Sequence, residues 1–305
     1  MCIRDSAYAY FKQKRYADAT VYFASALEES TTTLDTRGKQ SLLPDLYLRY
    51  ADCLFVIKSY QKSVDAYSEI VKQNWPSAEY AQFQKGIILG LMNRDDEKIA
   101  ALNMLLNKYP SSNYADQAYY EIAETQLSNN NLAASQLSFQ TLISKYPASS
   151  YVPRSYLNLA VIAYNSGKKE QALDNYKTVV KRFPETSEAK ESIDALKELY
   201  VEVGRADEFF DFVKSNSAVV ISDAEQDSLT YQSALKAYDA GDCSRAIKLF
   251  EGYITKFPSG YFTGEVYWRK AECHIKAKDF TDALLSLDGA VSYTHLDVYK
   301  RQAVG

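Results

Sequence analysis

Few side chains in this sequence are able to do redox, metal or acid–base chemistry. It holds four cysteines and two histidines, of which Cys2 and His295 lie in terminal segments that are set aside below. The others are Cys53, Cys243, Cys273 and His274. Their spacing matches neither a zinc-binding pattern nor a CxxC redox motif, so we predict no metal site. Cys53 and Cys273 fall on helical patterns and are expected to be small buried apolar residues, although an odd cysteine count leaves open one reactive thiol.

Acidic pairs are the remaining candidates for acid–base chemistry. Asp95-Asp96 and Glu121 with Glu124 fall on helical surfaces, where a solvated face is the expected role. The sequence also lacks the GxxxxGK[ST] and GxGxxG phosphate motifs, the HExxH metal motif and the GxSxG nucleophile motif. We therefore predict no catalytic residue, no cofactor and no enzymatic activity.

Composition indicates an ordinary globular chain. Hydrophobic residues make up 47% and charged residues 24%, with a net charge of −4. This balance argues against a basic surface for nucleic acid. Only seven prolines and eleven glycines interrupt 305 residues, which favours long helices over many short strands.

A repeat organises the chain. An aromatic residue followed by proline closes an amphipathic run at Trp75-Pro76, Tyr109-Pro110, Tyr146-Pro147, Phe183-Pro184 and Phe257-Pro258. The successive prolines are 34, 37, 37 and 74 residues apart, and 74 is twice 37. One repeat has therefore lost its marker, and the others keep a period of about 37 residues.

The repeat that ends at Pro184 shows two helices. Its first apolar face has three- and four-residue spacing and comprises Tyr156, Leu159, Ala160 and Ala163. Gly167 then supplies the backbone freedom that a helix C-terminus prefers. A second amphipathic run follows, with Ala172, Tyr176, Val179 and Val180. The pattern predicts helix A, a tight turn, helix B and a stop at Pro184.

This unit resembles the tetratricopeptide repeat. The matching residues are Tyr156, Leu159, Ala160, Gly167, Ala172, Tyr176 and Pro184, then Ala234, Tyr238, Gly241, Ala246, Phe250 and Pro258, and finally Tyr267, Ala271, Ala283 and Leu287. The resemblance implies an all-α, right-handed α-solenoid of antiparallel helix pairs, with about seven or eight pairs. It also implies a non-catalytic protein-interaction scaffold with a protein or peptide partner and no nucleic acid.

Two departures from the repeat stand out. Residues 30–44 form a longer connection, and residues 215–226 follow a short, degenerate unit without the aromatic-Pro marker. The second is either a joint between an array at 7–216 and continuing units at 217–290, or a slightly irregular repeat. The last unit is expected to be truncated.

The resemblance places the partner on the concave helix-A face. The implied groove residues are Tyr80, Phe83, Ile87, Gln117, Tyr120, Glu124, Arg154, Leu157, Val161, Tyr164, Asn165, Tyr231, Leu235, Tyr238 and Trp268. The Lys and Asn clamp of the chaperone-tail-binding subclass is missing from these places. The alternative is that several of these residues, and most of the tyrosines, pack against neighbouring helices.

The junctions between repeats suggest a subclass. Tyr109–Ala115, Tyr146–Tyr151 and Phe257–Tyr261 share an aromatic-Pro-x-Ser-x-Tyr character, in which Ser caps the next helix and Tyr packs back on the previous pair. These junctions resemble bacterial envelope tetratricopeptide proteins of the outer-membrane assembly lipoprotein and Tol-Pal coordinator types. They imply a periplasmic or outer-membrane-associated protein without membrane insertion here. A cytosolic adaptor, or a binding module of a larger enzyme, is the alternative.

Both termini resemble translated sequencing adapter. Met1–Ser6 back-translates as ATG TGT ATA AGA GAC AG, and the same bases in the frame GAT GTG TAT AAG AGA CAG read Asp297–Gln302. The reverse complement GTC TCT TAT ACA CAT reads Val291–His295. We therefore expect residues 1–6 and 291–305 to be adapter and tail that flank a metagenomic fragment, with little burial of the tail.

Overall fold

The chain folds into antiparallel helix pairs. The computed structural model describes residues 3–33, 36–217 and 219–303, and these contain sixteen helices and no strand. The helices are α1 (Ile3–Lys12), α2 (Tyr16–Thr33), α3 (Thr36–Val56), α4 (Tyr60–Lys72), α5 (Ala78–Leu91), α6 (Asp95–Lys108), α7 (Ala115–Ser128), α8 (Leu132–Lys145), α9 (Val152–Asn165), α10 (Lys169–Arg182), α11 (Ser187–Glu202), α12 (Ala206–Asn216), α13 (Asp223–Asp239), α14 (Cys243–Lys256), α15 (Thr263–Lys276) and α16 (Phe280–Ala303). The predicted all-α solenoid of seven or eight pairs is confirmed, with eight pairs among these residues.

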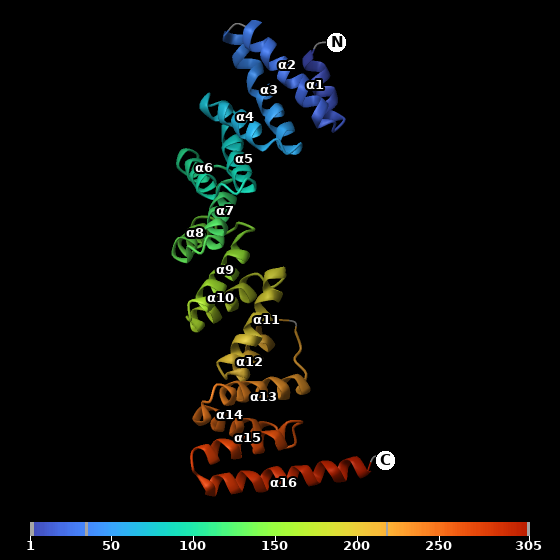
Figure 1. The fold of residues 1–305 in the computed structure, drawn as a ribbon, viewed down its shortest axis with the longest axis vertical. Helices are drawn as coiled ribbons and strands as arrows, with labels where there is room; N and C mark the ends of the chain where they lie inside the picture. Colours follow the sequence, from blue (N-terminus) through green and yellow to red (C-terminus); the bar gives the residue numbers. More distant parts are fainter. Residues whose placement is uncertain (1–2, 34–35, 218, 304–305) are drawn as a thin grey trace. The chain divides into compact units, whose positions relative to one another are not determined.

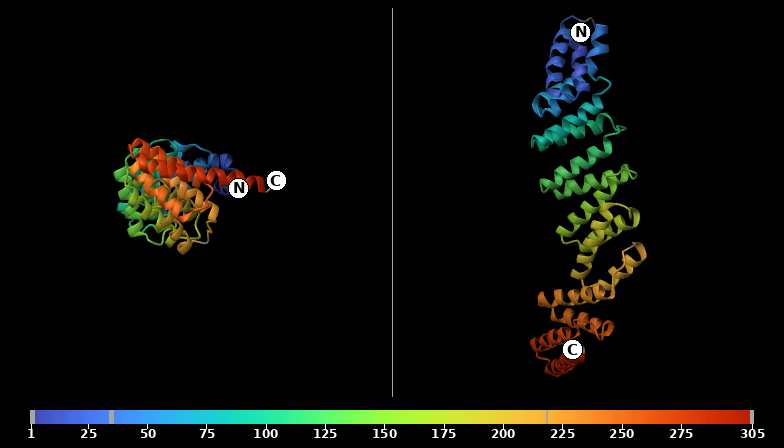
Figure 2. Two further views of the ribbon diagram at one scale, coloured as in Figure 1. Left: turned by 90° about the horizontal axis from the view of Figure 1, so that it is seen from below. Right: turned by 90° about the vertical axis from the view of Figure 1, so that its right-hand side faces the viewer.

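The pairs fall into two compact units. Met1–Ser155 form the N-terminal unit and Tyr156–Gly305 form the C-terminal unit. Within each unit, the pairs follow one another in sequence order and stack on their neighbours (Figures 1 and 2). Among the described residues, no helix combines the length and the apolar character needed to cross a bilayer.

A small residue in helix A marks the close approach in seven of the eight pairs. Six fully buried alanines occupy this place: Ala7, Ala51, Ala123, Ala160, Ala234 and Ala271. A large apolar residue follows sixteen positions later in helix B, as Phe23, Tyr67, Phe139, Tyr176, Phe250 and Leu287. In the α5/α6 pair the small residue is Gly86, and a Cβ there would lie 2.6 Å from Cδ2 of Leu102, sixteen positions later. The helices therefore approach closely enough to exclude any larger side chain.

The turn inside each pair is equally regular. Seven positions after the small residue of helix A, the backbone takes a positive φ, at Lys14, Lys58, Asn93, Asn130, Gly167, Gly241 and Lys278. The same place in the α11/α12 pair is Gly204, with φ of 69°. A single left-handed residue ends an α-helix and lets the chain reverse after a short turn. The degenerate pair keeps this turn although its small residue is replaced by Lys197.

The prediction of a long connection at residues 30–44 is wrong in part. Helix α2 extends to Thr33, and α3 begins at Thr36 with Pro44 inside it. Leu43 and Leu46 are buried in the cluster that contains Phe23 of the first pair. Apolar packing of this segment therefore overrides the turn-like composition that suggested a loop.

The predicted joint at residues 215–226 lies inside the C-terminal unit. Leu229, beyond this segment, packs in the same cluster as Phe209 and Phe212 of α12. The Lys197 ammonium also contacts the Glu225 carboxylate at 2.8 Å. Packing thus continues across the segment, and a boundary between 216 and 217 stays a prediction.

The predicted adapter segments lie partly outside the described residues, at 1–2 and 304–305. Helix α1 begins at Ile3, and helix α16 ends at Ala303. Tyr293 is half-buried and stacks on Tyr267 with ring centroids 5.8 Å apart. Its hydroxyl donates a hydrogen bond to the carbonyl of Pro258. Tyr293 therefore makes packing contacts that the adapter hypothesis did not anticipate.

Replacing Ala160 tests the close approach. Ala160 is fully buried in the cluster that includes Tyr176, so Ala160→Leu overpacks the contact and should lower the free energy of unfolding by about 1–3 kcal/mol. Lys168→Leu, on the exposed turn of the same pair, should change it by less than about 0.5 kcal/mol. Urea denaturation of both variants measures the difference. Equal effects would show that the assigned register is wrong.

Candidate partner-binding surface

The predicted groove residues differ widely in exposure. Phe83, Leu157 and Tyr231 are buried, with 8% exposure or less. Tyr164, Asn165 and Trp268 are exposed. The half-buried members are Tyr80, Ile87, Gln117, Tyr120, Glu124, Arg154, Val161, Leu235 and Tyr238. The three buried residues contribute to the core, as the alternative interpretation of these aromatic and aliphatic residues expected.

Three of the predicted groove aromatics stack on the next junction. Each pairs with the aromatic residue 31 positions later, which precedes helix A of the following pair. The stacks are Phe83 with Tyr114 (centroids 5.0 Å), Tyr120 with Tyr151 (4.9 Å) and Tyr231 with Phe262 (4.3 Å). The prediction that the junction tyrosine packs back on the previous pair is therefore confirmed for Tyr114 and Tyr151. It is wrong for Tyr261, which is 88% exposed, because Phe262 takes the stacked place at that junction.

The junction serines bond to the backbone just before the next helix. The expected serine cap is not found at α7, whose N-cap residue is Tyr114 and which has no side-chain capping hydrogen bond. The N–H of Tyr114 donates to Oγ of Ser112 at 3.3 Å, and the N–H of Tyr151 donates to Oγ of Ser149 at 3.2 Å. The Ser149 hydroxyl also donates to the Asp116 carboxylate of the previous pair at 2.6 Å. The serines thereby satisfy backbone donors in the turn that opens the next helix A.

The third junction replaces serine with Gly260 and uses a buried carboxylate instead. Asp227, 8% exposed, accepts the N–H of Tyr261 at 2.7 Å and the hydroxyl of Tyr253. A Cβ at Gly260 would lie 2.9 Å from Asp227 and 2.5 Å from the Tyr253 hydroxyl oxygen, so this position has no room for one. Burial and the Asp227 hydrogen bond raise the pKa of Tyr253. The Tyr253 hydroxyl therefore stays protonated and structural.

Tyrosine hydroxyls also join the helix A of one pair to the helix A of the next. Tyr164 donates to Glu202 at 3.0 Å, and Tyr238 donates to Glu272 at 2.6 Å. The Lys169 ammonium, 2.8 Å from Glu202, lowers the pKa of that carboxyl. These two tyrosines are predicted groove residues, and each is already engaged within the array.

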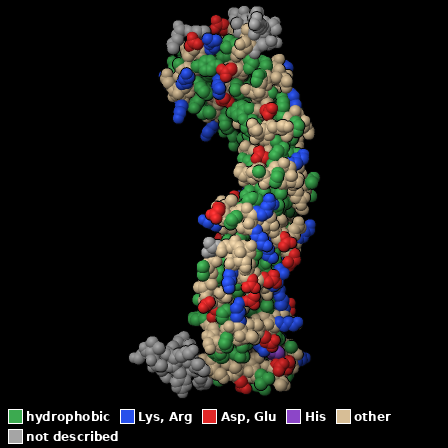
Figure 3. Space-filling view, turned by 180° about the vertical axis from the view of Figure 1, so that it is seen from behind, with side chains coloured by type: hydrophobic (Ala, Val, Ile, Leu, Met, Phe, Trp, Pro, Cys, Tyr) green, Lys and Arg blue, Asp and Glu red, His purple; other side chains and the backbone are tan. Residues whose placement is uncertain are grey.

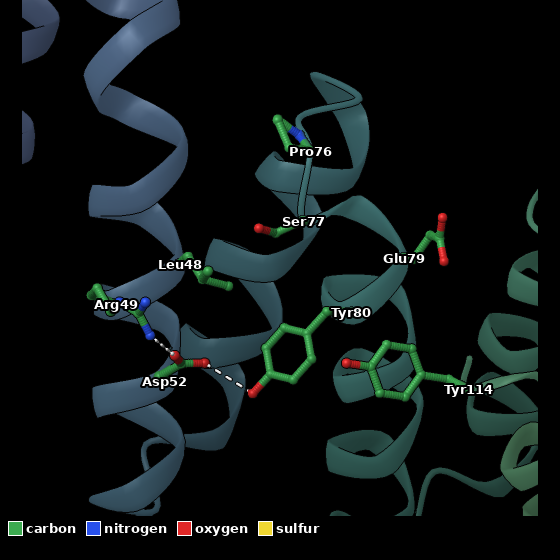
Figure 4. Close-up of a pocket in the computed structure, with 8 residues that line it drawn as sticks. All are labelled: Leu48, Arg49, Asp52, Pro76, Ser77, Glu79, Tyr80 and Tyr114. Carbon is green, nitrogen blue, oxygen red and sulfur yellow. Dashed lines mark hydrogen bonds and ion pairs between the residues drawn. The ribbon is translucent and has the colours of Figure 1, made fainter. Parts of the chain in front are cut away.

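The N-terminal unit contains a pocket on its helix-A side. Its volume is about 440 Å³. The lining residues come from three successive pairs (Figure 4): Leu48, Arg49 and Asp52 of α3, then Pro76, Ser77, Glu79 and Tyr80 at the start of α5, and Tyr114 before α7. Of the predicted groove residues, Tyr80 is the one that lines it.

Asp52 is the centre of this pocket. It accepts hydrogen bonds from the hydroxyls of Tyr67 at 2.7 Å and Tyr80 at 3.2 Å, and it lies 3.5 Å from Nη1 of Arg49. Burial raises the pKa of Asp52, and the Tyr67 hydrogen bond and the Arg49 charge oppose this rise. Burial and the Asp52 charge together raise the pKa of Tyr80 to about 12. Figure 4 shows Tyr80 between Asp52 and the Tyr114 ring, with Glu79 turned away.

Sequence reasoning missed Arg49 and Asp52. They belong to the α3/α4 pair, which lies before the first aromatic-Pro marker that set the repeat register. The small residue of that pair is Ala51, so counting back 35 positions from Gly86 identifies α3 as a helix A. That count gives Asp52 the place of Ile87 on the predicted face. Arg49 takes the place of Gln84, which the alignment did not assign to the groove.

One side-chain group among the described residues has the composition of a cation site. His274, Asp279 and Asp282 place one ligand atom each within 4.8 Å of one another. Asp279 already accepts the N–H of Asp282 at 3.3 Å, so its carboxylate caps the start of α16. Acidic residues in the first turn of a helix are stabilised by the helix dipole. Capping therefore accounts for the two carboxylates without a metal.

Comparison with known proteins agrees with this architecture. A model of the tetratricopeptide repeat-like domain matches residues 55–196, and a model of the tetratricopeptide repeat matches residues 231–294. The chain carries tetratricopeptide-type repeats. The stretch between the two matches, 197–230, holds the end of α11, all of α12 and the first part of α13, and it begins at Lys197, which replaces the small residue of the α11/α12 pair. Loss of the repeat pattern there is therefore visible both in the sequence and in the packing.

One solved structure has a similar fold, and a second match is weaker. A tetratricopeptide repeat protein from Parabacteroides merdae has a TM-score of 0.50 and 11% identity, and the match covers 89% of this chain and 97% of that one. The MamA protein of Desulfovibrio magneticus has a TM-score of 0.44 and 15% identity, with 58% and 90% covered. A search of curated proteins finds no match. At such identities the likeness concerns the fold alone.

The stack of Tyr231 on Phe262 can be used to test whether ring stacking stabilises the contact between two neighbouring tetratricopeptide-type helix pairs. The rings are 4.3 Å apart and nearly parallel, at 4°. In a double-mutant cycle, Tyr231→Leu and Phe262→Leu should show a coupling energy of about 0.5–1.5 kcal/mol in urea denaturation. Tyr261→Leu, at an 88% exposed ring, should change stability by less than about 0.5 kcal/mol. A coupling near zero would mean that the two rings do not join the pairs.

Proposed function

We propose that this protein is a non-catalytic scaffold that binds an extended segment of a partner protein along its helix-A face. In the N-terminal unit, the pocket around Asp52 takes one side chain of that segment. The observation that carries this proposal is the pocket itself, formed by helix-A and junction residues of three successive pairs. Its volume of about 440 Å³ lies within the range of sites that hold a small ligand or a side chain.

The chemistry of the pocket suits a peptide. Arg49 presents a guanidinium that is 37% exposed, and Asp52 presents a carboxylate that is 18% exposed. Arg49 can donate hydrogen bonds to backbone carbonyls of an extended segment, and Asp52 can accept them from its backbone N–H groups. The rings of Tyr80 and Tyr114, 6.0 Å apart, offer apolar faces to one of its side chains. Tyrosine and arginine are also the residue types that tend to dominate binding energy at protein interfaces.

The distribution of charge on the rest of the surface favours a protein, rather than a nucleic acid, as the binding partner. On the face shown in Figure 3, acidic and basic side chains are interspersed over the C-terminal unit. A nucleic-acid surface would gather lysine and arginine on one face. We propose a location in the bacterial cell envelope, and the support for it is the junction motif with its hydrogen-bonded serines and stacked tyrosines.

The pocket is tested with peptides selected from a random phage-displayed library against the whole chain. Arg49→Ala should weaken the binding of pocket-directed peptides about tenfold, the equivalent of about 1.4 kcal/mol. The matched control is Arg94→Ala. Arg94 has a similar side-chain exposure of 35% and a similar ion pair, with Glu97 at the start of α6. Fluorescence anisotropy measures both affinities, and circular dichroism checks that both variants are folded.

The outcomes separate clearly. A loss with Arg49→Ala and none with Arg94→Ala supports the pocket. Equal affinities for both folded variants would show that selected peptides bind elsewhere. If the library yields no peptide whose binding is weakened by Tyr80→Phe, peptide recognition at this face is contradicted.

A further inference from the structure

The last helix pair, α15/α16, exposes large apolar side chains at places that earlier pairs cover. Trp268 of α15 is 53% exposed, and Leu284 of α16 is 63% exposed. Both places recur along the repeat, because Trp268 lies three positions before the small residue Ala271 and Leu284 lies thirteen positions after it. The exposure of each can therefore be compared with that of its counterparts in the preceding pairs.

At the place of Trp268, three earlier pairs hold an aromatic residue that stacks on the next junction. These residues are Phe83, Tyr120 and Tyr231, and each stacks on the aromatic residue 31 positions later. For Trp268 that position is 299, which lies within α16 and not at a junction. Among the described residues, no junction therefore follows to stack on Trp268.

At the place of Leu284, four earlier pairs hold an aliphatic side chain that the array covers. Val64 and Leu173 are buried there, and Ile99 and Ile247 are half-buried. Each of these residues lies on a helix B that another helix pair follows, whereas α16 is the last of the described helices (Figure 1). The exposure of Leu284 therefore reflects its position in the array and not a change in the type of side chain.

The contact between α14 and α15 shows what covers this side of a helix B. The two helices pack on each other, and the Lys270 ammonium of α15 contacts the Glu251 carboxylate of α14 at 2.9 Å. Ile247 lies four positions before Glu251, one turn away on the same side of α14, so that side faces α15. On α16 the same two places hold Leu284 and Asp288.

The α15 side of that contact gives the pattern of a helix that fits. Phe262 stacks on Tyr231, Val266 is fully buried, and Lys270 pairs with Glu251. The three residues of this segment are four positions apart, so they share one side of the helix. An aromatic residue, an aliphatic residue and a lysine at this spacing therefore match a helix pair that offers a ring, an apolar side chain and a carboxylate.

We propose that Trp268, Leu284 and Asp288 form a docking surface for an amphipathic helix of a partner protein. An aromatic residue of that helix stacks on Trp268, an aliphatic residue four positions later packs on Leu284, and a lysine after four more pairs with Asp288. The surface continues the contact that joins α14 to α15, and exposed apolar groups of this kind mark interaction sites. It lies in the C-terminal unit and is separate from the pocket around Asp52.

A synthetic peptide with the sequence of residues 260–277 and the change Cys273→Ala serves as the probe, because it carries the α15 pattern. Fluorescence anisotropy of the labelled peptide measures its affinity for the whole chain. We expect saturable binding that Leu284→Glu weakens about tenfold, since a charge then meets the aliphatic residue of the peptide. Trp268→Ala, which removes the stacking ring, should weaken binding to a similar extent.

The matched control is Leu285→Glu. Leu285 is 65% exposed, close to the 63% of Leu284, but successive residues of a helix point to different sides. Its place in α14 is held by the exposed Lys248. Leu285→Glu should therefore leave the affinity unchanged, and circular dichroism checks that each variant is folded.

Charge reversal tests the role of Asp288. A second peptide that also carries Lys270→Glu should bind the wild-type chain about fivefold more weakly, because an attraction becomes a repulsion. Asp288→Lys in the chain should restore its affinity.

The chain alone should sediment as a monomer. A dimer that Leu284→Glu dissociates would show that a second copy covers this surface, and it would overturn the proposal. Absence of saturable peptide binding, equal affinities of the Leu284→Glu and Leu285→Glu variants, or failure of Asp288→Lys to restore binding would overturn it as well.

Discussion

The close approach of helix A to helix B is the constraint on which this structure depends. At Gly86 the space is so narrow that even a methyl group would lie 2.6 Å from Leu102. In six other pairs the same place holds a fully buried alanine. Because helices packed this closely tolerate little change in volume, a small residue and its large partner must keep a constant spacing. The left-handed residue seven positions after the small one sets the length of the turn that this spacing requires.

Contacts between pairs are built from a second set of residues. The stack of Tyr120 on Tyr151 and the hydrogen bond from Tyr164 to Glu202 each join one pair to the next. Each helix pair on its own leaves an apolar face exposed, so stacking on a neighbour is what buries it. The residue 31 positions after Leu157 is Glu188, which is not aromatic, and the apolar cluster that contains Leu157 also includes three phenylalanines of α12. The degenerate pair thus keeps its packing by different means.

This use of the aromatic residues limits what is available for recognition. Phe83 and Tyr231 are buried by their stacks, and the hydroxyl of Tyr238 is bound by Glu272. The open space on the N-terminal unit is instead polar at its centre, where Asp52 gathers Tyr67, Tyr80 and Arg49. The pocket on the N-terminal unit is therefore lined by paired charges and tyrosine rings.

The sequence by itself determined the helix pairs, their period and the places of the close approach. Ala160, Gly167 and Tyr176 could be assigned from spacing alone, because each contact within a pair depends on a short and regular stretch of chain. The junction tyrosines were also predictable, since the same motif precedes several helices. The helical course of residues 36–44 was not, because burial of Leu43 outweighed local composition.

Only the tertiary structure decided which side chains from different pairs meet. Asp52 and Tyr80, which meet through a hydrogen bond, come from neighbouring pairs. Whether two such side chains meet depends on how far one helix pair is shifted and rotated relative to the next. The volumes of all the side chains packed between the two pairs set that shift and rotation. The same bulk decided that Phe83 is buried and Trp268 exposed, although both occupy the helix-A face in sequence.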